Sequence, residues 1–157
     1  MSSPNDALRQ RAAELFTNEE YGAMMSLLDI HVLEKAQDAE LYAWRARSHT
    51  KLKENETGFA YANKAVELDP ENAHAYLARG NAWFNKGQFH KAIEDYSRSV
   101  EISPGQSGAF CNRGNSWLRL GNWDKAISDF DHAVELDPSN LLAYRLRSLA
   151  WSESGIG

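Results

Sequence analysis

Hydrophobic and small residues recur at helical spacing within residues 73–106, where they form two sets. The first set is Tyr76, Arg79, Gly80 and Trp83, and the second is Ala92, Ile93, Tyr96 and Val100. Members of the first set follow Tyr76 by three, four and seven positions, so they share one face of a helix, and the second set behaves alike. Gly87 stands between the sets and can end a helix with a positive φ. The pattern predicts two amphipathic helices joined by a short turn.

The same pattern returns after 34 residues. The segment AVELDP at 65–70 recurs at 133–138, with the variant SVEISP at 99–104, so three prolines are spaced evenly. Overlaying residues 73–106 on 107–140 places aromatic residues on aromatic residues and glycine on glycine. The matched pairs include Tyr76 and Phe110, Gly80 and Gly114, Trp83 and Trp117, Ala92 and Ala126, and Tyr96 and Phe130. A fixed period of this length indicates stacked helix pairs, because one pair cannot bury its apolar face alone.

This order of aromatic, Gly, aromatic, Ala, aromatic and Pro resembles the tetratricopeptide repeat (TPR) family. The resemblance implies an all-α fold, a right-handed superhelical solenoid of antiparallel helix pairs, with 1–157 as a single TPR domain. The expected units are a divergent or capping repeat at 5–38, repeats at 39–72, 73–106 and 107–140, and a terminal first helix at 141–157. Ser3 is the expected N-cap of the first unit, and Pro4 its first helical residue.

Composition excludes several classes of function. The net charge of −5 argues against a nucleic-acid binder, which normally carries a basic excess. Cys111 is the only cysteine, so no intrachain disulfide forms and multi-thiolate zinc sites are excluded. The start has no signal-peptide pattern, and no window reaches the roughly 18 apolar residues of a membrane span. We therefore expect a cytoplasmic protein that neither binds nucleic acid nor inserts into a membrane.

The candidate chemistry is sparse. The five histidines show no metal-binding spacing, so no metal or cofactor is expected. Cys111 could act as a nucleophile with His74 on the neighbouring first helix beside it. The favoured alternative is that Cys111 lines the groove without a catalytic role. We predict that the chain is not an enzyme.

Several residues recur in register and are expected to be structural. The arginines are Arg45, Arg79, Arg113 and Arg147, and laying their stems across helix interfaces is favoured over ligand contact. The tryptophans Trp83, Trp117 and Trp151 are predicted core residues. Trp44 falls on the neighbouring face, where an exposed ring is a candidate binding hot spot. The acidic residues of second helices, including Asp95, Asp129 and Asp131, are expected on a solvated outer face.

First helices line the concave groove in the family that this chain resembles, and peptides usually bind there. Helical spacing selects polar, basic and aromatic residues for that face: Trp44, Arg47, Lys51, His74, Asn81, Phe84, Asn85, Asn112, Asn115, Arg119 and Arg145. A cationic floor would hold an acidic or carboxylate-bearing peptide, and asparagines would grip its backbone. The alternative is that these are merely solvated helix residues.

Co-chaperones of this family clamp the C-terminal carboxylates of heat-shock chaperones with lysine, arginine and asparagine. Here Asn81 and Asn112 match that clamp, but Leu77, Leu142 and Leu146 occupy its cationic positions, so chaperone-tail binding is not predicted. The favoured function is a scaffold or adaptor that binds a peptide segment of another protein. The alternatives are a regulatory or targeting domain of a larger enzyme, and a secretion-type or co-chaperone-like protein.

The terminal helix presents Leu142, Leu146 and Leu149 on a face that lacks a partner helix. Such a face favours association. Either the chain continues in a longer protein, or this helix docks on another copy, giving a homo-oligomer, or on a partner.

Overall fold

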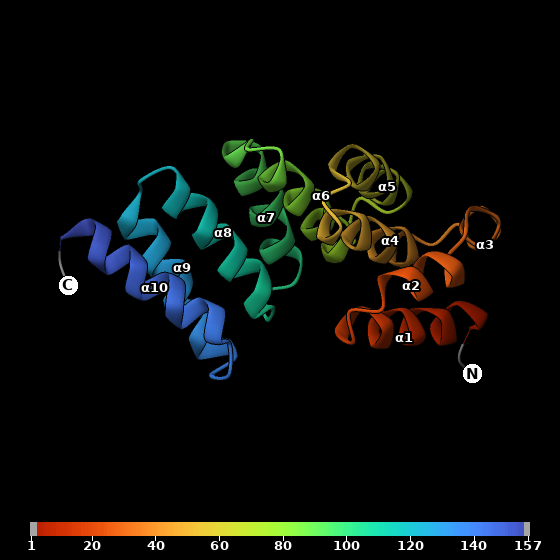
Figure 1. Ribbon diagram of the computed structural model, residues 1–157, viewed down its shortest axis with the longest axis horizontal. Coiled ribbons are helices and arrows are strands. Elements are labelled where there is room, and N and C mark those ends of the chain that lie inside the picture. The colour runs from red at the N-terminus through yellow and green to blue at the C-terminus, as the bar shows by residue number, and fades with distance from the viewer. Residues whose placement is uncertain (1–2, 156–157) are drawn as a thin grey trace.

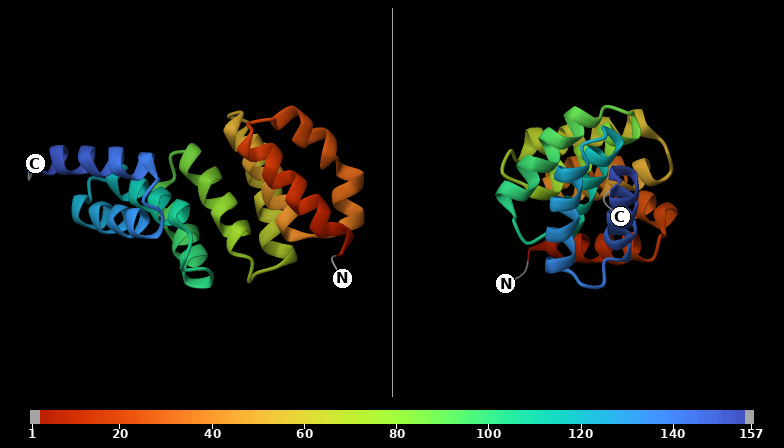
Figure 2. Two further views of the ribbon diagram at one scale, coloured as in Figure 1. Left: turned by 90° about the horizontal axis from the view of Figure 1, so that it is seen from below. Right: turned by 90° about the vertical axis from the view of Figure 1, so that its left-hand side faces the viewer.

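The computed structural model describes residues 3–155, which form ten α-helices and no strand. They are α1 (Pro4–Thr17), α2 (Tyr21–Leu27), α3 (Ile30–Ala36), α4 (Ala39–Lys51), α5 (Asn55–Leu68), α6 (Ala73–Asn85), α7 (Phe89–Ile102), α8 (Ser107–Arg119), α9 (Trp123–Leu136) and α10 (Leu141–Ser154). The predicted all-α repeat fold is confirmed. In Figures 1 and 2 the helices follow chain order along an elongated molecule whose termini lie at opposite ends. None of the described helices is long and apolar enough to cross a membrane.

The turn that follows each first helix has one backbone signature. Positive φ angles occur at Glu19, Lys53, Gly87, Gly121 and Gly155, which are 34 residues apart throughout. Glycine adopts such angles without strain, so three of these turns use it. Glu19 shows that the first unit shares this backbone although its side chains diverge.

Polar caps begin most of the first helices. The side chains of Asp38, Asn72 and Asn140 accept hydrogen bonds from backbone N–H groups three residues ahead. Ser3 caps α1 through the N–H of Asp6, whose side chain accepts in turn from the Ser3 N–H. This reciprocal capping box satisfies two backbone donors and confirms the predicted start at Ser3 and Pro4.

The first unit differs from the others because its second helix is split into α2 and α3. Asp29 caps α3 by accepting from the Val32 N–H. The Leu28 carbonyl, placed at the break, accepts a hydrogen bond from Arg45 Nη1 at 2.6 Å. The break thus places this carbonyl where an arginine of the next unit can bind it.

The in-register arginines Arg79 and Arg113 have structural partners within the fold, which they hold through their guanidinium groups, and these partners correct the prediction for the acidic residues. Arg79 and Arg113 make paired hydrogen bonds of 2.7 to 2.9 Å to Asp95 and Asp129. Those aspartates are only 6% and 4% exposed, so they are buried partners and not members of a solvated face. Helical spacing within one helix could not reveal these pairs, because each joins the first helix of a unit to its second helix.

The tryptophan prediction also needs correction. Trp83 and Trp117 are half-buried, and Trp151 is exposed. Lys91 and Lys125 lie over the rings of Trp83 and Trp117. The fully buried aromatic residues are instead Tyr96 and Phe130, which reach the first helices at Gly80 and Gly114.

Candidate functional site

A pocket of about 380 Å³ opens where α4, α6 and α8 present their neighbouring faces. Seven of the eleven predicted groove residues line it: Arg47, Lys51, Asn81, Phe84, Asn85, Asn112 and Asn115. Cys111 also contributes to the lining, as does Leu142 at the start of α10. The structure therefore brings most of the residues predicted from helical spacing to one place.

Two asparagine amides of the pocket lining are joined by a hydrogen bond. Asn81 Oδ1 accepts hydrogen bonds from the Tyr96 hydroxyl at 2.6 Å and from Asn112 Nδ2 at 3.0 Å. These bonds fix the orientation of both amides, so Asn81 Nδ2 and Asn112 Oδ1 are the atoms left for a ligand. A donor and an acceptor side by side suit the backbone of an extended peptide.

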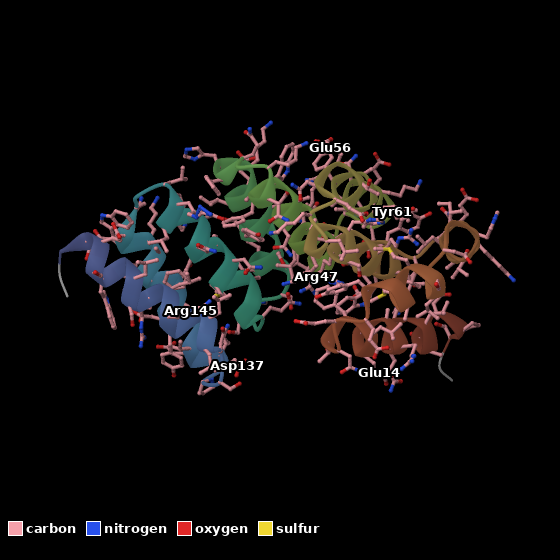
Figure 3. The ribbon with its side chains drawn as sticks, viewed as in Figure 1. Glu14, Arg47, Glu56, Tyr61, Asp137 and Arg145 are labelled. Atoms are coloured by element: carbon pink, nitrogen blue, oxygen red, sulfur yellow. The ribbon has the colours of Figure 1, made fainter. Side chains whose placement is uncertain are left out.

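Arg47 lines this pocket and also borders a neighbouring one, formed with residues that include Trp44, His74 and Glu40. Figure 3 shows it near the middle of the molecule. Its guanidinium stacks on Phe16 at 4.3 Å, and its Nη1 donates to His74 Nε2 at 3.0 Å. Its Nε is buried and has no hydrogen-bond partner within residues 3–155. Burial lowers the pKa of Arg47 to about 10, so the side chain is cationic at neutral pH.

The nearest carboxylate does not neutralise Arg47. Glu40 Oε1 accepts from His74 Nδ1 at 2.7 Å, and Glu40 Oε2 accepts from Asn72 at 3.2 Å. Because Arg47 can only donate, His74 Nε2 must accept and Nδ1 must carry the proton. His74 is therefore neutral, and its burial lowers its pKa. No ion pair to Arg47 occurs in the described part of the chain.

The charge of the pocket has one sign. Arg47, Lys51 and Lys53 are its cations, and no aspartate or glutamate among the described residues lines it, although the chain as a whole carries −5. A potential of this kind steers and retains anionic groups.

Four predicted residues lie elsewhere. Trp44 and His74 line the neighbouring pocket, and Trp44 is a half-buried ring packed on Phe16 and His74, not a free hot spot. Arg119 lies over Phe84 and Phe89, each at 5.6 Å. Arg145 is exposed on α10, and Figure 3 shows it far from Arg47.

Sequence reasoning missed four polar lining residues, namely Thr50, Lys53, Tyr96 and Asn140. Tyr96 comes from a second helix, which the first-helix rule excluded. Its ring lies against Gly80, and this contact lets its hydroxyl reach Asn81. The pairing of a glycine with an aromatic residue 16 positions later was the available signal.

The Cys111 and His74 pair is not a nucleophile and base. Both ring nitrogens of His74 are engaged, one by Arg47 and one by Glu40. Burial raises the pKa of the Cys111 thiol to about 11, so little thiolate exists at neutral pH.

Known proteins with similar sequences share the repeat region of this chain. The Hsp70-Hsp90 organizing protein of Triticum aestivum is 30% identical over 91 residues, which are 58% of this chain and 16% of that protein. The Protein SGT1 homolog of Oryza sativa subsp. japonica is 34% identical over 85 residues, 54% of this chain and 23% of that protein. The chain thus matches less than a quarter of the length of these relatives.

Solved structures with this fold include a thermophilic TPR protein of Thermus thermophilus. It has a TM-score of 0.80 at 20% identity, covering 96% of this chain and 82% of that one. The first TPR of Spaghetti (RPAP3), bound to the HSP90 peptide SRMEEVD, has a TM-score of 0.71 at 21% identity. That match covers 77% of this chain and 95% of the other.

Family models described as tetratricopeptide repeat match residues 39–72, 73–106 and 108–140, which together make up more than half of the chain. Each match coincides with one helix pair: α4 with α5, α6 with α7, and α8 with α9. The chain therefore belongs to the tetratricopeptide repeat family.

Proposed function

We propose that this protein is an adaptor whose groove binds an extended, carboxylate-bearing peptide segment of a partner protein. The observation that carries the proposal is Arg47, a cationic side chain with a buried Nε that has no partner in the described chain and no ion pair. It lies in a pocket whose other charges are lysines and whose lining includes asparagine amides. A carboxylate bound there is attracted by the positive charges of Arg47, Lys51 and Lys53, which no carboxylate of the pocket lining offsets.

The relatives support the peptide class of ligand. One structure with this fold holds an HSP90 peptide with two glutamates and a terminal aspartate. The cations of the present pocket, however, are not at the positions of the chaperone-tail clamp, where this chain has leucines. Leu77 is 7% exposed and Leu142 lines the pocket, so the positive charge comes from Arg47, Lys51 and Lys53. We therefore expect a preference for acidic peptides that differs from that of chaperone tails.

The test is selection from a library of heptapeptides with free C-termini, followed by fluorescence-polarisation titration of the enriched sequences. We expect acidic peptides to be enriched, and Arg47→Met to weaken their binding about tenfold or more, because it removes hydrogen bonds to a charged ligand but keeps the packing on Phe16. Lys64→Gln, on the exposed surface of α5, is the matched charge control and should bind normally. Neutral enriched peptides, or equal binding by Arg47→Met, would contradict the proposal.

A further inference from the structure

Lysine and arginine gather at the turns that follow α4, α6 and α8. Three segments spaced 34 residues apart, 51–58, 85–92 and 119–126, hold six cations and three carboxylates. The cations are Lys51, Lys53, Lys86, Lys91, Arg119 and Lys125. The segments that connect one helix pair to the next, 67–72, 101–106 and 135–140, hold six carboxylates and no lysine or arginine. We call the first set the turn edge and the second set the acidic edge.

The two edges lie on opposite sides of the molecule. Figure 1 shows the α6–α7 and α8–α9 turns at the upper side and the α7–α8 and α9–α10 connections at the lower side, and Figure 3 labels Glu56 at the upper side and Asp137 at the lower side. The helices between them have 13 or 14 residues, so the edges are about 20 Å apart. The screening length at physiological ionic strength is only about 8 Å. An anionic partner at the turn edge is therefore shielded from the acidic edge.

The cations of the turn edge are available to an external anion. Among the described residues only Lys86 is in an ion pair, with Glu56 at 2.8 Å. Lys91 and Lys125 are exposed, and each lies over a tryptophan ring, 4.6 and 4.4 Å from its centroid. Arg119 is also exposed and lies over two phenylalanine rings. The rings hold these cations in place but do not neutralise them.

Large apolar side chains stand among these cations. Leu52 lies between Lys51 and Lys53 and is 46% exposed, and Leu120 follows Arg119 and is 37% exposed. Each leucine is the first residue after its helix and directly precedes a residue of positive φ, so each lies at the tip of a turn. Exposed leucines flanked by basic residues are typical of surfaces that lie on a membrane without crossing it.

We infer that the turn edge docks peripherally on a membrane that is rich in anionic phospholipid. The lysines and Arg119 meet the negative headgroups, and Leu52 and Leu120 reach the boundary between the headgroups and the acyl chains. Each basic residue near such a surface strengthens binding by several-fold. Because three carboxylates offset the six cations, the binding is weak and reversible. This contact requires no membrane-spanning helix, and it does not depend on the groove proposal.

A bilayer fits the turn edge better than nucleic acid or an acidic protein segment does. Nucleic acid offers negative charge but no apolar layer for the two leucines, and the tryptophan rings that would stack on bases lie half-buried under Lys91 and Lys125. An acidic protein segment must match the spacing of the turns. A bilayer presents its charge and its apolar layer to all three turns at once.

The experiment is co-sedimentation of the full chain with vesicles of equal parts phosphatidylserine and phosphatidylcholine, compared with vesicles of phosphatidylcholine alone. We expect partition into the anionic vesicles at low salt that falls about tenfold or more in about 0.5 M salt, because salt screens exposed charges. The neutral vesicles should leave the protein in solution. These comparisons use the unaltered protein, so misfolding cannot cause the differences.

Variants then locate the contact on the protein. The double variant Lys91→Gln and Lys125→Gln should weaken binding to anionic vesicles about tenfold or more. Its matched control is Lys35→Gln with Lys64→Gln, since both of these lysines are exposed and lie outside the turn edge. That control removes the same charge and should bind like the wild type. Leu120→Gln should weaken binding several-fold at unchanged charge, because it removes apolar contact with the bilayer.

Several results would overturn the inference. The first is absence of sedimentation with anionic vesicles at low salt, and the second is equal binding to neutral vesicles. Equal loss of binding in the double variant and its control would show that only the net charge of the chain matters. If poly-glutamate bound through Lys91 and Lys125 while the vesicles did not bind, the turn edge would belong to an acidic protein partner.

Discussion

At Gly114 one missing carbon sets the distance between two helices. A Cβ at this position would lie 2.7 Å from Phe130 Cε1 and 3.1 Å from Asp129 Cβ. Both neighbours are buried, and Asp129 is held by Arg113, so neither can retreat without breaking other contacts. Gly80 stands in the same relation to Tyr96, and there the tyrosine hydroxyl donates to Asn81 in the pocket lining. A packing glycine in this protein therefore also positions a site residue.

Replacing Gly114 by alanine should lower the free energy of unfolding by about 1 to 3 kcal/mol, because the added methyl group overpacks the helix crossing. Urea denaturation followed by circular dichroism measures the change. Gly108→Ala on the same helix is the control: a Cβ there meets open space, so improved helix propensity should leave stability equal or raise it by up to about 1 kcal/mol. Equal destabilisation by both variants would show that the crossing is not tightly packed.

At the scale of elements, His74 joins α4 to α6 by bonding Glu40 on one side and Arg47 on the other. This bridge requires the neutral imidazole, because a protonated ring would place two cations face to face. Burial lowers the pKa of His74 below its ordinary value of 6.5. The unfolded chain therefore binds more protons than the folded chain just below pH 6.5, and stability falls as the pH falls toward the folded pKa.

The free energy of unfolding should accordingly decrease between pH 7.5 and pH 5.5, and His74→Asn should flatten that decrease. Denaturation at a series of pH values gives the slope for each protein. Burial raises the pKa of Glu40, but the hydrogen bond from His74 and the other polar contacts outweigh that effect, so the pKa is lowered. The pH window lies above the ordinary pKa of a glutamate, so Glu40 contributes little to the pH dependence of stability. His31→Asn, on the exposed face of α3, controls for loss of an unbridged histidine and should keep the wild-type slope.

Across the whole molecule, sequence reasoning succeeded for features that the repeat period and the spacing within one helix determine. The 34-residue period and helical spacing located the turns, the packing glycines and seven of the residues that line the pocket between α4, α6 and α8. It failed where long side chains join two helices. Asp95 and Asp129 were predicted to be solvated, and Tyr96 was predicted to be a core residue only. The split of α2 from α3 was equally hidden, because its cause is an Asp29 cap and a carbonyl bond to Arg45.

The hydrophobic core of the molecule is divided along the solenoid. One cluster runs from Ala12 to Ala78, a second from Leu77 to Ala109, and a third from Cys111 to Ala150. Each cluster is built by helices that are neighbours in the chain, so the free energy of each unit depends chiefly on itself and on the adjacent units. Damage to one end should therefore not spread evenly to the other.

Phe130→Ala removes the largest fully buried side chain of the third cluster and should cost about 3 to 5 kcal/mol locally. Hydrogen exchange followed by mass spectrometry can resolve where the cost falls. We expect amide protection to drop in α8, α9 and α10, while α4 and α5 keep theirs, because regions of a repeat protein open separately. Leu33→Ala in the first cluster should produce the reverse pattern. If both variants lowered protection equally from α1 to α10, the chain would unfold as one cooperative unit, and the pocket between α4, α6 and α8 would be lost with either end.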